Sequence, residues 1–470
     1  MLTVLIRNFV VARHHLTYKE PVSKRLFHFT GRREAQPQLS PYDVNLLLRE
    51  HEYTHNFQED NTIRSYESNQ LSSNSPCEDT RTEASFIHKN AFICGIFDGH
   101  AGPSCSQVVS KRLLRYIAAS VVDRDVLRDQ IAKGCTSQSF LRCHNDKVDF
   151  VKDIKDIYEN SFSSFIATIS SQEAESRAAA IENAFVSLDN DLSEEALKQR
   201  NMLTMSVAMS GAVACVAYIE NLDLHVASVG DCSAVLGVQS AETGQWHAKK
   251  LNNEHNVDNI QEVTRILGEH PAEEKDTVIR NDRLLSQLAP LRALGDFRYK
   301  WSHEIMDKYV IPTFGPNVVP PNYYTPPYLS GRPEVMHHVL TPNDKFLVIA
   351  SDGLFDFLSP SQIVTLVGDH LASKKYLEPM KLPPGDVKLG EVSDILGKRK
   401  AGRARKPLDQ NSATHLIRNA LGSTDYGIEF SKISYYLSLP QDVVRLYRDD
   451  ITVTVIYFNT DFIANSTVKT

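Results

Sequence analysis

The stretch FICGIFDGHA, Phe92 to Ala101, decides the fold of this chain, because an apolar strand-like segment ends abruptly there in Asp98-Gly99-His100. Asp98 offers a carboxylate that could bind a hard metal ion, and His100 an imidazole that could donate a proton. Gly99 has no side chain, so its backbone carbonyl could be exposed. Taken alone, the tripeptide is better explained as a common Asp-Gly turn followed by a surface histidine. Other acidic residues in the chain change that balance.

Carboxylates stand at the ends of several predicted core strands, often next to glycine. They are Glu78-Asp79 in CEDTR, Asp98 itself, Asp352 in ASDGLFD and Asp449 in YRDDITVTVI. Such carboxylates can converge on one end of a β-sandwich and form an oxygen-only site suited to Mg²⁺ or Mn²⁺. Asp231 in VGDCSA and Asp356 occupy similar places and could hold a further ion. No Cys/His set with zinc spacing competes with this interpretation.

A site of this kind predicts hydrolysis at phosphorus. Two such ions can activate a water for in-line attack, so that no protein nucleophile is needed. The leaving serine or threonine oxygen is a poor alkoxide unless it is protonated, and His100 beside the carboxylates is the candidate general acid. The alternative for His100 is a structural hydrogen bond or a place in the metal shell.

Apolar patterns predict strand groups that alternate with helix groups. Strands are expected in a hairpin over 84–97 and at 211–219, 222–228, 234–238, 345–350 and 451–458. Helices are expected over 40–52, over 176–200 and from Ser104, which could cap its helix. Residues 58–75 are polar, and no strand is predicted there. Residues 135–175 are mixed and show no clear boundary between secondary-structure elements. This order predicts an α+β fold with sheet-on-sheet packing flanked by helices rather than regular βαβ winding.

The two ends of the chain differ from its body in charge. Residues 1–40 carry seven Lys and Arg against Glu20 and Glu34, with Leu2, Leu5, Ile6 and Phe9 at helical spacing. This pattern favours a cleaved mitochondrial presequence, with a flexible basic N-terminus as the alternative. Residues 41–462 are predicted to form a single domain with insertions near 312–333 and 381–410, followed by a tail at 463–470.

Composition excludes several classes of protein. The net charge is −7, and the chain beyond residue 40 holds 44 basic against 56 acidic residues, which argues against a nucleic-acid binder. No stretch approaches the roughly 18 uncharged apolar residues of a membrane helix, so no transmembrane segment is predicted. The seven cysteines form no C-x-x-C pair, which favours reduced, mostly buried thiols.

Five motifs carry a family resemblance. FDGHAG, SGAVACVA followed by VGD, LRALGDF, ASDGLFD and RDDITV occur in the order found in metal-dependent protein phosphatases of the 2C type, which this chain resembles from about Pro76 to Phe458. The resemblance implies a four-layer αββα fold with a central antiparallel β-sandwich. It also implies dependence on Mg²⁺ or Mn²⁺ and hydrolysis of phosphoserine or phosphothreonine.

The resemblance also implies a role for each acidic position. Asp98 matches the carboxylate that bridges both ions, and the Gly99 carbonyl matches the backbone ligand of the second ion. Asp352 and Asp449 match the remaining ligands of the first ion. Glu78 matches the second-ion carboxylate, Asp79 a neighbour that acts through water, and Asp231 and Asp356 a weaker third site.

Two positions depart from the family pattern. Asn74 stands where most members have an arginine that binds the substrate phosphate. An amide offers neutral donors where a guanidinium forms a bidentate charged clamp, so phosphate binding should be weaker or should use another group. Cys232-Ser233 replaces the usual Ser-Arg, which puts in doubt whatever that arginine holds. Glu254-His255 is assigned no role.

Stretches outside the general motifs resemble the subfamily of mitochondrial pyruvate dehydrogenase phosphatases, which also has asparagine at position 74. These stretches include DGHAGPSCSQVVSKRL (98–113), PPNYYTPPYL (320–329) and LSLPQDVVRLYRDDIT (437–452). The resemblance implies a matrix enzyme that dephosphorylates and reactivates the E1α subunit. Another matrix phosphoprotein as substrate and a catalytically inactive scaffold are the alternatives. It stays open whether Ca²⁺ mediates docking to the lipoyl domain of the E2 core and whether a regulatory subunit binds.

Two insertions could contact partners. The loop 320–328 exposes tyrosines and prolines and is either a docking loop or a loop packed by its own side chains. The basic residues at 398–406 are either a partner-binding cluster or, more simply, a solvated and mobile insertion.

Overall fold

The computed structural model describes residues 39–145, 150, 152–375, 388–403 and 408–467. The described residues belong to one compact unit that begins at Leu39. The predicted presequence lies outside them, apart from its last two residues. None of the helices in these ranges combines the length and apolar character needed to cross a membrane.

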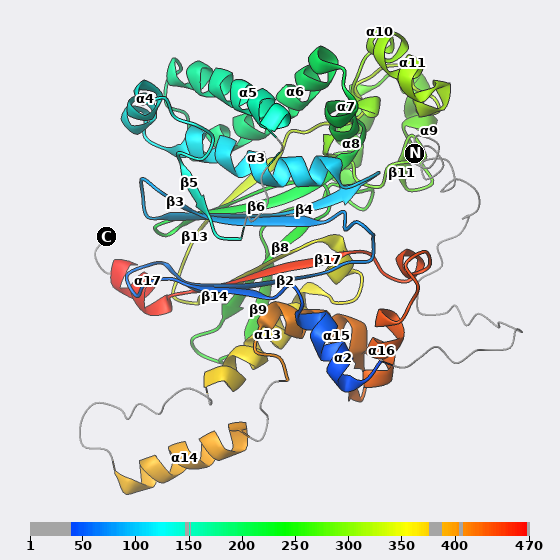
Figure 1. The fold of residues 1–470 in the computed structure, drawn as a ribbon. Coiled ribbons are helices and arrows are strands. Elements are labelled where there is room, and N and C mark those ends of the chain that lie inside the picture. Colours follow the sequence, from blue (N-terminus) through cyan, green and yellow to red (C-terminus); the bar gives the residue numbers. More distant parts are fainter. Residues whose placement is uncertain (1–38, 146–149, 151, 376–387, 404–407, 468–470) are drawn as a thin grey trace, which may run out of the picture. The chain divides into compact units, whose positions relative to one another are not determined.

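Two antiparallel sheets form the centre of this unit (Figure 1). The first has the order β1 (Tyr53–Asn56), β2 (Ile63–Leu71), β17 (Ile451–Phe458), β14 (Asp344–Ala350), β8 (Ser233–Gln239) and β9 (Trp246–Lys250). The second has the order β13 (Glu334–Val339), β7 (Asp223–Val229), β6 (Gly211–Glu220), β4 (Ala91–His100), β3 (Thr80–Phe86) and β5 (Leu141–Cys143), with β12 (Leu294–Gly295) paired to β6. The predicted α+β sandwich is therefore confirmed.

The central strands are buried along nearly their whole length because both of their faces are covered. All residues of β17 are buried, as are nine of the ten in β6. One core cluster joins the inner faces of both sheets, where Phe92 of one sheet stacks near Tyr66 of the other. Burying one such aromatic side chain contributes roughly 1.5 to 3 kcal/mol.

Helices cover the outer face of each sheet and complete the four layers (Figure 1). On the second sheet lie α3 (Ser104–Val121), α4 (Arg124–Ala132), α5 (Lys152–Ser170), α6 (Arg177–Gln199) and α7 (Met202–Met209). On the first lie α2 (Pro41–Arg49), α13 (Pro360–Lys375), α15 (Ser412–Gly422) and α16 (Phe430–Leu437), around a second core cluster. The prediction that Ser104 caps its helix is wrong, because Pro103 stands at the N-cap of α3 and Ser104 is the first residue of that helix.

The expectation that 58–75 contains no strand is wrong, because β2 runs through it. Two of its buried polar side chains, Asn69 and Glu67, are bound by helices of the outer layer. Asn69 donates to Leu48 O and to Thr414 Oγ1, both at 2.7 Å. Lys374 donates to Glu67 at 2.5 Å. A strand whose buried polar groups are satisfied by distant helices shows no apolar alternation in its sequence.

The two insertions have ordered parts. In 312–333, Tyr323 and Tyr328 are buried and their hydroxyls donate to Trp301 O and to Glu274, so these two side chains attach the loop to the rest of the domain. Within 381–410, residues Leu389–Arg403 form helix α14. The side chains of the basic residues at 398–406 lie outside the described part of the chain.

Candidate metal and phosphate site

The end of the second sheet brings Glu78 beside the Asp98-Gly99 segment. Strand β3 pairs with β4 so that Thr80 faces Phe97, which places the residues preceding Thr80 next to Asp98 and Gly99. A side chain at Gly99 would meet Glu78 O at 2.4 Å and Ser106 Oγ at 2.6 Å. Glycine is therefore required here for the two segments to approach this closely.

The first sheet delivers its acidic residues to the same place. Ala350 pairs with Val453 on one side and with Ser233 on the other, so the segments that carry Asp352, Asp449 and Asp231 meet at one end of the sheet. Two hydroxyl groups of this sheet, Ser351 Oγ and Thr452 Oγ1, donate to Asp79 Oδ2 at 2.8 and 2.7 Å. Asp79 thus ties the two sheets together at the site.

The gathered carboxylates repel one another. Burial and the charges of Asp79, Asp352 and Asp231 raise the pKa of Asp98 well above its usual value. The pKa of Asp352 is raised in the same way by burial and by Asp231 and Asp449. Burial, with neighbouring acids, raises the pKa of Asp79 to about 7 and that of Asp231 to about 6. These upward shifts indicate that the positive charges near the cluster among the described residues do not offset the mutual repulsion of its carboxylates.

A divalent cation fits this donor set. Asp352 Oδ1 is buried and has no hydrogen-bond partner among the described residues. The donors are all oxygens, as Mg²⁺ and Mn²⁺ prefer. In the part of the chain that the structure describes, no three acidic, His or Cys side chains enclose a point tightly enough to hold an ion as they stand. Binding would therefore draw the carboxylates together against their mutual repulsion.

His100 lies at the same strand end and is held by Asp296, a residue that the sequence interpretation missed. Its Nε2 makes a short contact with Asp296 Oδ2. Burial lowers the pKa of His100, but the carboxylates of Asp296, Asp231 and Glu78 together raise it by more, so the net shift is upward. Asp296 adopts a left-handed backbone conformation, with φ 50°, directly after β12. It belongs to LRALGDF, and that motif was the available signal.

Asn74 binds the protein itself. Its Nδ2 donates to Asp450 Oδ2 at 3.0 Å and its backbone N–H donates to Asp450 Oδ1 at 2.9 Å. Asp450 also accepts from the backbone N–H groups of Ser73 and Glu78. These donors lower the pKa of Asp450 although burial opposes the shift. Asp450, which the sequence interpretation also missed, therefore anchors the segment that carries Glu78.

Asp231 and Asp356 are near enough to interact, as the third-site prediction requires. Repulsion from Glu254 and Asp356 contributes to the raised pKa of Asp231, while His100 counters it. The turn before Asp231 is held by His255, whose Nδ1 accepts from Gly230 N at 3.2 Å. His255 therefore has a structural role here, and the sequence analysis assigned it no function. Glu254 accepts from Ser233 Oγ at 2.5 Å, beside the buried Cys232.

Replacing Asp450 by Ala is expected to weaken Mn²⁺ binding by about tenfold or more, because four donors of the 73–78 segment would lose their acceptor and Glu78 its fixed position. Calorimetric titration with Mn²⁺ measures this affinity. Asp425→Ala, at an exposed position, is the control and should bind as the unchanged protein does. Equal affinities for both variants would show that Asp450 does not position the site.

Comparison with known proteins shows to which family this chain belongs. The family model described as protein phosphatase 2C matches residues 138–385. That range holds Asp231, Asp296, Asp352 and Asp356, while Glu78, Asp98 and Asp449 lie on either side of it. The chain belongs to the protein phosphatase 2C family.

Two curated relatives cover nearly all of the chain. Mitochondrial pyruvate dehydrogenase (acetyl-transferring) phosphatase 1 of Bos taurus is 39% identical over 479 residues, covering 95% of this chain and 88% of the relative. The corresponding phosphatase 2 of Homo sapiens is 40% identical over 453 residues, covering 91% and 84%. Among solved structures, serine-threonine phosphatase 2C from Toxoplasma gondii has a TM-score of 0.45 and 14% identity, covering 86% of this chain and 99% of that one.

Proposed function

We propose that this chain is a metal-dependent serine/threonine phosphatase that dephosphorylates and reactivates the E1α subunit of pyruvate dehydrogenase. The observation that carries the proposal is the convergence of mutually repelling carboxylates from both sheets at one end of the sandwich. The two relatives described above are named for phosphatase action on pyruvate dehydrogenase, and each is about 40% identical to the chain. The same names support a mitochondrial location, and we propose the matrix.

In this proposal, Asp98, the Gly99 carbonyl, Glu78, Asp352 and Asp449 hold two Mg²⁺ or Mn²⁺ ions. Asp79 acts beside them through its ties to both sheets. Asp231 and Asp356 would hold a third ion. The ions supply an activated water and offset the negative charge of the phosphoryl group.

Residues of the chain supply the proton that the leaving serine oxygen needs. The Asp296 carboxylate favours the protonated form of His100, since it raises the pKa of the imidazole. An imidazolium at this position can donate its proton to the serine oxygen as that oxygen leaves phosphorus. Asn74 retains a second N–H on its amide with which it can bind the phosphate while it donates to Asp450.

Two alternatives remain from the sequence. The first keeps the chemistry and changes the substrate to another mitochondrial phosphoprotein. The second is an inactive scaffold, but the complete set of carboxylates favours an enzyme, because an inactive family member has no need to keep a cluster that destabilises its metal-free fold. The lipoyl domain of E2, bound with or without Ca²⁺, and a regulatory subunit would be further partners of the same enzyme.

The test compares substrates under identical conditions. With Mn²⁺, phosphorylated E1α is expected to have a kcat/KM at least about tenfold above that of phosphocasein, since contacts outside the phosphoserine add binding energy in the transition state. Excess chelator should abolish both activities. Equal kcat/KM values would favour the other-substrate alternative, and a folded protein without activity on either substrate would favour the scaffold.

A further inference from the structure

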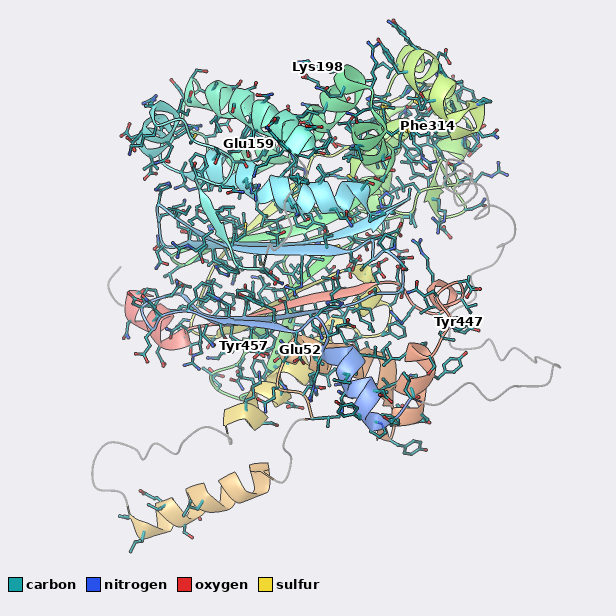
Figure 2. All side chains as sticks on the ribbon, in the orientation of Figure 1. Glu52, Glu159, Lys198, Phe314, Tyr447 and Tyr457 are labelled. Atoms are coloured by element: carbon teal, nitrogen blue, oxygen red, sulfur yellow. The ribbon has the colours of Figure 1, made fainter. Side chains whose placement is uncertain are left out.

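Arg445 lies against the carboxylate cluster and is largely exposed. Its Nη1 is 3.1 Å from Glu78 Oε2, while 52% of its side chain is accessible, against 9% for Glu78. It belongs to a short 3₁₀ turn, η6 (Val444–Leu446), which comes shortly before Asp449 and Asp450 at the start of β17. Its neighbours Leu446 and Tyr447 are also exposed, so the turn faces solvent; Tyr447 is labelled in Figure 2.

Other polar groups around the cluster are already engaged by the protein. Arg448 is buried, and its guanidinium donates to Ser73 Oγ at 2.6 Å and to Ser72 O at 2.8 Å. His100 is held by Asp296, and the amide of Asn74 donates to Asp450. Arg445 differs from these because, among the described residues, its guanidinium contacts one carboxylate oxygen and about half of its side chain is exposed.

We propose that Arg445 binds the phosphoryl group of the substrate and supplies the guanidinium that position 74 does not provide. The proposal rests on the proposed phosphatase function and deepens it. A guanidinium can pair with two phosphate oxygens at once, which an amide cannot do. The contact with Glu78 places Arg445 at the rim of the carboxylate cluster, where the phosphoryl group must lie to react.

The contact with Glu78 also explains why Arg445 is available. Arg445 lowers the pKa of Glu78, although burial keeps the net shift upward. A carboxylate that ligates a cation shares its charge, so its hold on a neighbouring guanidinium weakens. Arg445 is then free to turn its remaining N–H groups toward the phosphate. Because the side chain is half exposed, this movement needs no change in packing.

The experiment measures inorganic phosphate as a competitive inhibitor of the Mn²⁺-loaded enzyme. Arg445→Ala is expected to raise the inhibition constant for phosphate by about 10- to 100-fold, the range for loss of a charge-assisted hydrogen-bonded pair. KM for a phosphoserine peptide should rise in parallel. Arg445→Lys should fall between Ala and Arg, since it keeps the charge but loses the bidentate geometry.

Two controls separate this role from others. Leu446→Ala alters the same exposed turn, and Arg128→Ala removes a cation from α4; neither should change phosphate inhibition. Calorimetric titration with Mn²⁺ and thermal unfolding report on Glu78 and on folding independently of activity. If Arg445→Ala changes Mn²⁺ affinity but leaves phosphate inhibition unaltered, Arg445 merely screens Glu78 and the inference is overturned. If the protein without any substitution shows no phosphatase activity, the proposed function itself is contradicted.

Discussion

Asp98→Asn is expected to lower kcat with Mn²⁺ by at least about a thousandfold and to raise the melting temperature of the metal-free protein. The folded-state pKa of Asp98 is raised, so its ionisation destabilises the fold at every pH above the pKa of the unfolded state. Asparagine has nearly the same shape and removes that charge. The gain should be roughly 1 to 3 °C for a chain of this size.

Steady-state kinetics with Mn²⁺ measure the loss of kcat, and scanning calorimetry with chelator and with Mn²⁺ measures the change in melting temperature. The unsubstituted protein should gain stability when Mn²⁺ is added. Asp98→Asn should gain much less, because it lacks one of the carboxylates that would hold the ions. Asp425→Asn, an exposed replacement of the same kind, should behave as the unchanged protein. If Asp98→Asn lowered the metal-free melting temperature, the carboxylates would not be under the repulsion inferred here.

His100→Ala is expected to reduce kcat on a phosphoserine peptide by about 100- to 1000-fold and on an aryl phosphate by less than about tenfold. An aryl oxide leaves without protonation, whereas a serine alkoxide needs a proton. Steady-state kinetics on both substrates at one pH measure the difference. Asp296→Asn should show the same selectivity to a smaller degree, since it removes the charge that favours the imidazolium.

Equal losses on the two substrates would contradict the general-acid role and leave His100 with a structural or metal-shell role. Thermal unfolding of His100→Ala separates these outcomes from misfolding. A fall in kcat with little change in KM is expected, because the proton is transferred in the transition state and not on binding.

Much of the site could be predicted from local sequence. FICGIFDGHA shows a buried strand that ends in a carboxylate and a glycine, and Asp352 and Asp449 stand beside strands with equally apolar patterns. Alternation and strand ends are properties of a few consecutive residues, so they can be recognised without the rest of the chain. The order of the motifs then indicated which of these strand ends belong together.

Other features depend on pairings between distant segments. Asp296 reaches His100 across 196 positions of sequence, Asp450 anchors a segment 376 positions earlier, and Glu78 meets Arg445 only because that anchor holds. Likewise, β2 is a strand because it pairs with the distant strand β17, and helices far away in the sequence satisfy two of its buried polar side chains. The sequence by itself determined which residues could act as ligands and acid, through strand patterns and charge. Only the tertiary structure decided which partner each one has, because the hydrogen bonds and charge interactions that assign partners depend on distances that folding alone creates.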